Sequence, residues 1–138
     1  MNIEMNWQGG YKFSGQSIFG HEISTDASKK IGGAEDGYQP LELLMYGLAG
    51  CTGIDVVLIA GKMKQEITGI RIKINAEQRE ENPRAFTKAH IEYIFEGKNL
   101  SRGKLEKAIK LSEEKYCSAA ATLSGVTEIT HSCIIKGE

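Results

Sequence analysis

Two cysteines have surroundings that suit reactive thiols. Cys51 lies among small residues inside a strongly apolar segment, 40–60, whose only formal charges are Glu42 and Asp55. Cys117 precedes a second run of small residues. Charged groups are costly to bury, so the two retained carboxylates indicate a buried helix with polar groups kept for a purpose. The two cysteines are therefore a candidate redox pair.

Cys117 is the residue that favours redox chemistry over inert burial. A buried cysteine is most often a small hydrophobe without reactivity, and that interpretation would suffice for Cys51 alone. Cys117, however, is predicted at the junction of two helices, where unpaired backbone N–H groups and the helix dipole lower a thiol pKa.

The third cysteine has a histidine near it. In a strand, Cys133 and His131 would share one face and could supply half of a zinc site. No close Cys-x-x-Cys or His-x-x-x-His pair supports such a site, so the sequence predicts no metal ligands. His21 and His90 lie apart from other cysteines and carboxylates and are predicted to be ordinary strand residues.

The two carboxylates of the apolar segment have structural explanations. Glu42 near the start of a helix gains from the helix dipole, and Asp55 is expected to cap or to pair with a buried donor. Nine residues on a continuous helix place Glu42 opposite Cys51 and about 13 Å along the axis. Glu42 therefore cannot activate Cys51 of its own chain directly unless the helix is broken.

Hydrophobic periodicity and turn residues predict an α+β fold in one domain, 1–138, with the order βββ-α-ββ-αα-β. A turn is expected at Gly15, a hairpin turn at 80–84, and a helix N-cap at Ser101. The expected elements are strands 2–7, 11–14 and 16–25, a helix 40–63, strands 66–78 and 86–95, a helix from 101 to about 116, a short helix 118–123 and a strand 126–135.

Glycines recur along the long helix at Gly47, Gly50 and Gly53. Each costs roughly 1 kcal/mol of helix stability, so something should approach this stripe closely. Tight helix packing would explain the stripe, as would the approach of the segment that carries Cys117, and the two are compatible. A helix that is apolar nearly all round also predicts a homodimer, because one short chain offers too little cover.

Composition excludes several classes of partner. The 138 residues carry 17 basic and 18 acidic side chains, without a basic run that could follow nucleic acid or an anionic membrane. The segment 40–60 is long enough to span a bilayer, but its carboxylates and glycines predict no membrane span. The N-terminus lacks signal-peptide features, and three cysteines do not form a disulfide framework, so a cytoplasmic location is expected.

Several segments together resemble the superfamily of osmotically inducible protein C and organic hydroperoxide resistance proteins (OsmC/Ohr), closest to its YhfA-like branch. The segments are 39–44, 48–57, 116–118 and 82–86, and the opening pattern Trp7-x-x-Gly10-x-Lys12-Phe13-x-Gly15. The resemblance implies an intertwined homodimer with long central helices and two sites at the subunit interface. It makes Cys51 the peroxide-attacking cysteine and Cys117 its resolving partner.

The sequence departs from the family pattern at the residues that activate the attacking cysteine. Peroxidases of the superfamily use an arginine from the N-terminal strands and a glutamate directly after the proline. Here Leu41 follows Pro40, Glu42 is one place later, and Lys12 is the nearest N-terminal cation. Lys12 and Glu42 are the candidate replacements, but lysine lacks the bidentate fork of arginine, so activation would be weaker or differently arranged.

The first functional hypothesis is a thiol-dependent reductase of organic hydroperoxides that uses an external dithiol and no metal or organic cofactor. The second is a redox-sensing or small-molecule-binding module in which the same thiols react without turnover. The third is a structural protein with inert thiols. Catalytic consumption of peroxide in the presence of a dithiol separates the first from the second, and resistance of all three cysteines to alkylation in the folded protein would indicate the third.

Overall fold

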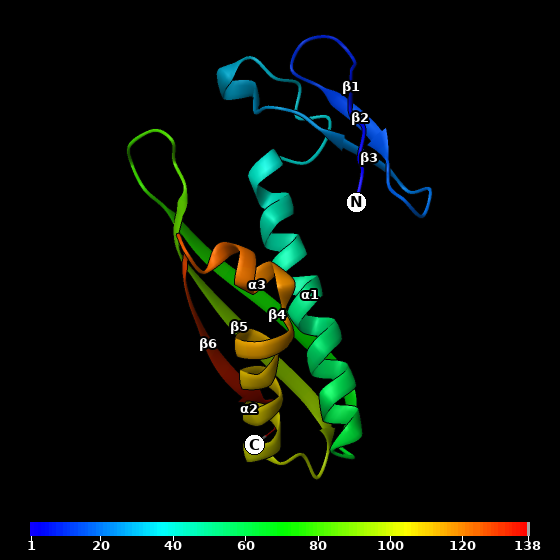
Figure 1. Ribbon diagram of the computed structural model, residues 1–138, viewed down its shortest axis with the longest axis vertical. Coiled ribbons are helices and arrows are strands. Elements are labelled where there is room, and N and C mark those ends of the chain that lie inside the picture. Colours follow the sequence, from blue (N-terminus) through cyan, green and yellow to red (C-terminus); the bar gives the residue numbers. More distant parts are fainter. Residues whose placement is uncertain (138) are drawn as a thin grey trace. The chain divides into compact units, whose positions relative to one another are not determined.

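The computed structural model describes residues 1–137, which divide into two compact units, one from Met1 to Leu44 and one that begins at Met45 (Figure 1). Each unit has a three-stranded sheet of its own. The observed order of strands and helices confirms the α+β class.

The first unit contains the antiparallel strands β1 (Asn6–Trp7), β2 (Phe13–Gln16) and β3 (Glu22–Thr25). Strands β1 and β3 are shorter than the sequence predicts, and β2 is as long as the strand expected at 11–14 but lies two residues later. The turn expected at Gly15 is wrong because Gly15 lies inside β2. A Cβ at position 15 would come within 2.2 Å of the Glu4 carbonyl oxygen, so the glycine permits close approach of the chain. The reversal occurs at Ser17, whose hydroxyl accepts the backbone N–H of His21 at 3.0 Å.

A carboxylate organises the loop that follows β3. Asp26 accepts the backbone N–H groups of Ala27, Ala34 and Asp36 at 2.7, 3.3 and 3.1 Å. The N–H groups of Asp36 and Ala27 lower the pKa of Asp26. A short 3-10 turn, Lys29–Ile31, lies within this loop.

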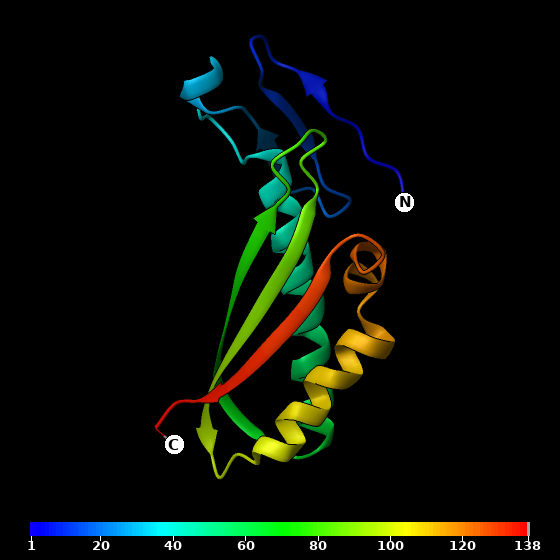
Figure 2. The same cartoon turned by 90° about the vertical axis from the view of Figure 1, so that its left-hand side faces the viewer.

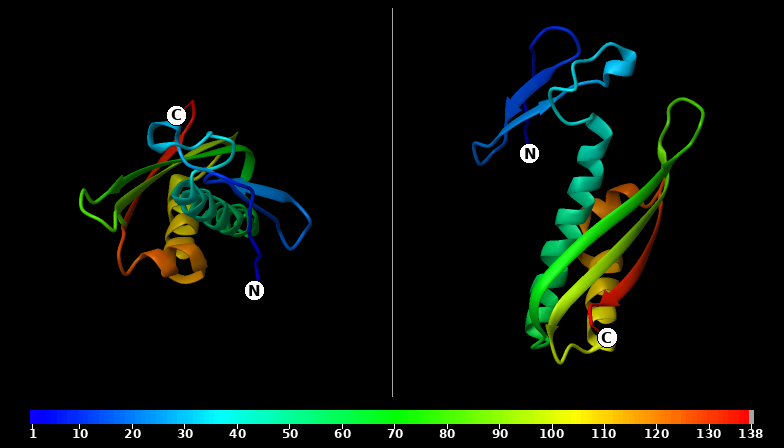
Figure 3. Two further views of the ribbon diagram at one scale, coloured as in Figure 1. Left: turned by 90° about the horizontal axis from the view of Figure 1, so that it is seen from above. Right: turned by 180° about the vertical axis from the view of Figure 1, so that it is seen from behind.

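The second unit packs helices on one face of a mixed sheet (Figures 2 and 3). The helix α1 (Pro40–Lys62) belongs to this unit from Met45 onward. The sheet has the strand order β4 (Glu66–Gln78), β5 (Phe86–Lys98), β6 (Glu128–Ile135). Strand β4 runs antiparallel to β5, and β6 runs parallel to it. The helix expected at 40–63 and the strand expected at 66–78 are confirmed. The remaining elements lie between β5 and β6 and are α2 (Arg102–Leu111), a π turn (Ser112–Tyr116) and α3 (Ser118–Leu123).

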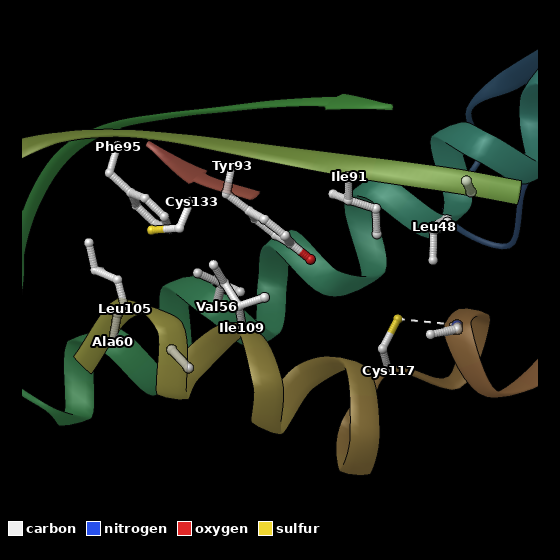
Figure 4. Packing of buried hydrophobic residues seen from close by; sticks show 13 residues of the cluster. Leu48, Val56, Ala60, Ile91, Tyr93, Phe95, Leu105, Ile109, Cys117 and Cys133 are labelled. Atoms are coloured by element: carbon white, nitrogen blue, oxygen red, sulfur yellow. Dashed lines mark hydrogen bonds between the residues drawn. The ribbon is translucent and has the colours of Figure 1, made fainter. Parts of the chain in front are cut away.

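Strand β5 forms the centre of the hydrophobic core. Alternate side chains of a strand point to one face, and here that face carries Ala89, Ile91, Tyr93 and Phe95, all fully buried. Figure 4 shows the last three extending from β5 toward the helices. They pack in one cluster with Leu48, Val56 and Ala60 of α1 and with Leu105, Ala108 and Ile109 of α2.

Helix α1 buries only one narrow stripe, formed by every fourth residue from Leu48 to Ala60. Ile54, Val57 and Leu58 remain 56 to 71% exposed. A Cβ built at Gly47 or Gly50 would have no neighbour within 4 Å among the described residues, apart from the helix's own backbone and the adjacent residues. A Cβ built at Gly53 would lie 3.1 Å from the Ile72 side chain. Within residues 1–137 of the single chain, none of the three glycines receives the segment carrying Cys117, so that expectation is wrong.

By length and composition, α1 also satisfies the criteria for a membrane span. One such helix is weak evidence, because the core helix of a soluble protein satisfies the same criteria. Here the helix contributes Leu48, Val56 and Ala60 to the hydrophobic core.

Candidate functional site

The second unit brings Cys51 and Cys117 together. Cys51 lies on α1 and is partly buried, while Cys117 lies between the π turn and α3 and is only 2% exposed. Cys51 lies near enough to Cys117 to raise the pKa of the Cys117 thiol. The structure therefore places the two cysteines singled out by the sequence near each other, and their action as a redox pair stays a prediction.

A π turn positions Cys117. The sequence predicts one continuous helix to about Tyr116, but the α-helix ends at Leu111 and the chain continues in the wider turn Ser112–Tyr116. The Cys117 N–H donates to the Ser112 carbonyl at 2.7 Å, which closes this turn. Turns of this kind occur mostly as single insertions in α-helices, frequently at functional sites. The N-cap expected at Ser101 is confirmed, since its hydroxyl accepts the Lys104 N–H at 3.3 Å.

Cys117 is itself the N-cap of α3, and its Sγ accepts the Ala120 N–H at 3.4 Å (Figure 4). The backbone N–H groups at the start of α3 lower the pKa of Cys117, as expected, but the expectation of a lowered pKa overall is wrong. Burial is the largest effect and raises the pKa of Cys117 to about 11, the Ala120 N–H opposes this, and the neighbouring Cys51 raises the pKa further. Cys117 is therefore a protonated thiol at neutral pH.

A chain of buried hydroxyl groups begins at Thr52, the residue after Cys51. The Thr52 hydroxyl lies 2.8 Å from the hydroxyls of both Tyr93 and Ser112. Ser112 Oγ donates to Asp55 Oδ2 at 3.0 Å, which confirms the expectation that Asp55 pairs with a buried donor. The side chains of Thr52, Tyr93 and Ser112 are fully buried.

The chain of hydroxyl groups continues to Glu113, because Tyr93 OH donates to Glu113 Oε1 at 3.3 Å. Three hydroxyl protons thus serve four hydrogen bonds between Asp55 and Glu113. All four can be satisfied together only if a carboxyl group carries one further proton. Burial raises the pKa of Glu113, although the charge and hydrogen bond of His131 oppose this.

His131 joins this network from β6. Its Nδ1 and Nε2 lie 2.9 Å from Glu113 Oε2 and Glu106 Oε2, respectively. Burial lowers the pKa of His131, but the hydrogen bond to Glu106 and the charge of Glu113 outweigh it and raise the pKa above its usual value. In the imidazolium form both ring nitrogens donate, which matches two carboxylate partners.

The possible zinc half-site at His131 and Cys133 has no further ligands. Within residues 1–137 no group of three or more His, Cys, Asp or Glu side chains could hold a metal ion. The network of Thr52, Tyr93, Ser112 and Glu113 could not be found from sequence, since its members come from three separate elements. The one feature of the network that the sequence indicates is the position of His131, on the same strand face as Cys133.

Lys12 and Glu42 belong to the first unit and have partners there. Lys12 Nζ lies 2.7 Å from Asp36 Oδ2, and this hydrogen bond raises the pKa of Lys12. Glu42 Oε1 accepts the Gln39 N–H at 2.9 Å, as expected for an acidic residue in the first turn of a helix. Action of either residue on Cys51 stays a prediction.

Comparison with known proteins assigns the class. The sequence profile of the family described as OsmC-like protein matches residues 32–132, so the chain belongs to this family. The chain is 36% identical over 132 residues to Protein YhfA of Escherichia coli (strain K12), and 96% of each sequence is covered. The YhfA-like branch predicted from sequence therefore fits.

Solved structures share the fold. A hypothetical protein of Aquifex aeolicus VF5 is 32% identical, with a TM-score of 0.86 over 98% of this chain and 95% of that one. An organic hydroperoxide resistance protein of Elizabethkingia anophelis has a TM-score of 0.73 over 99% and 97% of the two chains. At 18% identity the latter likeness concerns the fold alone.

Proposed function

We propose that this protein reduces organic hydroperoxides with Cys51 as the attacking thiolate and Cys117 as the resolving thiol. The observation that carries the proposal is that Cys51 on α1 lies close enough to Cys117, at the end of the π turn, to raise the pKa of Cys117. The unequal burial of the two thiols supports the division of roles, because the more accessible Cys51 can meet a substrate and the protonated Cys117 can act second.

The reaction has two steps in the protein. The Cys51 thiolate attacks the outer oxygen of the hydroperoxide, the O–O bond breaks, and the departing alkoxide takes a proton to become an alcohol. Cys51 is thereby oxidised to a sulfenic acid. The Cys117 sulfur then attacks the sulfenic sulfur, and the Cys117 proton leaves with the sulfenic hydroxyl as water. An external dithiol reduces the resulting disulfide by exchange, and no metal or organic cofactor enters the scheme.

Similarity adds support at the level of the family. The protein of Elizabethkingia anophelis with the same fold is named an organic hydroperoxide resistance protein. The replacement of the family's arginine by Lys12 and the shifted position of Glu42 fit a weaker or differently arranged activation of Cys51.

A homodimer and a cytoplasmic location form part of the proposal. Ile54, Val57 and Leu58 expose apolar surface on α1, and the open glycine positions 47 and 50 allow a second helix to approach closely. A second copy of the chain would cover this surface. A cytoplasmic location would supply dithiol reductants and keep the cysteines reduced between turnovers.

The test is peroxide consumption with a supplied dithiol, together with intact mass after one and then many equivalents of an alkyl hydroperoxide. Cys51→Ser should abolish single-turnover consumption, because no thiolate meets the O–O bond. Cys117→Ser should still gain one oxygen at Cys51 and then progress to sulfinic acid. Cys133→Ser is the matched control and should form the Cys51–Cys117 disulfide normally. Reversed roles, or Cys133 in the dominant disulfide, would refute the mechanism.

The alternative is a module that senses oxidants or binds electrophiles without turnover. The pKa of about 11 for Cys117 favours it, because a protonated and buried resolving thiol closes a disulfide slowly. In that case peroxide would oxidise Cys51 once, and a dithiol would not sustain consumption.

A further inference from the structure

The π turn before Cys117 is held by side chains from three other elements. Ser112 Oγ hydrogen-bonds Thr52 and Asp55 of α1. The next residue, Glu113, contacts Tyr93 of β5 and His131 of β6. Two consecutive residues of the turn are thus fixed to the elements around it.

Such anchoring matters because the π geometry is rare and poorly populated without a reason. The Ser112 carbonyl that receives the Cys117 N–H belongs to the same residue whose hydroxyl is fixed to α1, the helix that carries Cys51. A shift of the turn would therefore move Cys117 relative to Cys51.

His131 is the outermost anchor of the turn. Its side chain is 25% exposed, and its ring lies edge-on to Tyr93 with centroids 6.2 Å apart. Ionisable and charged groups surround His131: Glu106 and Arg102 on α2, Glu113 on the π turn, Tyr93 on β5, and Cys133, the next residue on the same face of β6. Arg102 donates a hydrogen bond to the Cys133 carbonyl at 2.6 Å. When the imidazole loses its proton, one ring nitrogen presents a lone pair to a carboxylate, and one of the two bonds is lost.

We propose that His131 is a positioning residue for disulfide closure: by holding Glu113 it keeps the π turn in place and Cys117 against Cys51. The inference rests on the proposed function and adds a residue to it. His131 touches neither thiol, so its removal should slow closure of the disulfide and leave the first attack on peroxide unchanged.

The experiment measures two rates in each variant, formation of the Cys51 sulfenic acid and its conversion to the disulfide, by rapid acid quench and intact mass. In His131→Leu closure should slow by about tenfold, the effect of one charge-assisted hydrogen bond, with more sulfinic acid under excess peroxide. His131→Asn should recover part of the rate, because its amide can replace Nδ1 as a donor to Glu113. His90→Asn is the matched control, since His90 also bridges two side chains of the sheet, Thr130 and Ser132, but has no contact with the turn.

The pH profile distinguishes positioning from a loss of packing. The ratio of the wild-type closure rate to that of His131→Leu should fall as pH rises through the pKa of His131, because only the wild type loses a donor there. Equal closure rates in the wild type and in folded His131→Leu, or a ratio that does not change with pH, would overturn the proposal. If His131→Leu does not fold, the closure rates of His131→Asn and Glu113→Gln are compared with that of the wild type across the same pH range instead.

A second oxidant separates this inference from the proposed function. Diamide takes two electrons and two protons from the two thiols and forms the disulfide without a peroxide step. If peroxide fails to oxidise wild-type Cys51, the proposed function is wrong, and slower diamide-driven closure in His131→Leu would still support positioning. If peroxide oxidises Cys51 normally and neither oxidant closes the disulfide more slowly in His131→Leu, the positioning role alone is wrong.

Discussion

The hydroxyl of Thr52 lies 2.8 Å from the hydroxyl of Tyr93, and both side chains are fully buried. This contact ties the helical residue next to Cys51 to the central strand of the sheet. The same Thr52 hydroxyl contacts Ser112 at the start of the π turn. One small side chain thus links α1, β5 and the turn that presents Cys117.

Removal of this hydroxyl should destabilise the fold. Thr52→Val keeps the shape but leaves the buried hydroxyls of Tyr93 and Ser112 each with one partner fewer, which should lower the free energy of unfolding by about 1–3 kcal/mol. Urea denaturation measures the change. Thr68→Val on the exposed side of β4 is the control and should stay within about 0.5 kcal/mol of the wild type. A Thr52→Val protein as stable as the control would show that the network contributes nothing to folding.

The contrast between Cys51 and Thr52 shows what sequence can reveal. Cys51 and Cys117 stand out by type and by their small neighbours, and the family resemblance assigns the attacking and resolving roles. Thr52 is an ordinary helical residue until Tyr93 and Ser112 arrive from distant parts of the chain. Helix α1 was predictable as a long apolar run that begins at a proline, and β4 was predictable from its alternating isoleucines.

Local exceptions to a pattern were not predictable. The π turn replaces helix at positions where the apolar spacing continues through Ser112, so the periodicity alone favours a longer α-helix. The pKa of Cys117 depends on burial by the sheet and on the neighbouring Cys51 more than on its place at a helix start. Both outcomes come from tertiary contacts, which a single sequence does not show.

The pKa of Cys117 should depend on Cys51. Because the hydrogen bond and charge of Cys51 raise it, Cys51→Ala should lower the pKa of Cys117 from its value of about 11. Burial is the larger effect, so the pKa should stay above that of an exposed cysteine. Ultraviolet absorbance of the thiolate during a pH titration, in a Cys133→Ser background, measures the shift. An unchanged pKa would mean that the two thiols do not interact.

Stability should fall with rising pH through His131 and Glu113. Both groups have pKa values raised in the folded protein, so the folded state binds more protons than the unfolded state. Their contribution is fully present below the unfolded pKa values, about 4.3 for glutamate and 6.5 for histidine, and is lost as pH rises through the folded values. The double variant His131→Asn/Glu113→Gln should lack this dependence, whereas His90→Asn should keep it. Urea denaturation at a series of pH values provides the measurement, and identical pH slopes in all three proteins would contradict the assignment.

A homodimer through α1 should be sensitive to charge on its exposed face. Ile54→Lys and Val57→Lys place cations at positions that are 71 and 56% exposed in the single chain and that a second copy would bury. Static light scattering at micromolar concentration should show a dimer for the wild type and a monomer for either variant. Ile134→Lys, an apolar residue 40% exposed on the other face of the sheet, is the control and should remain dimeric. A monomeric wild type, or variants that dimerise as well as the control, would rule out α1 as the interface.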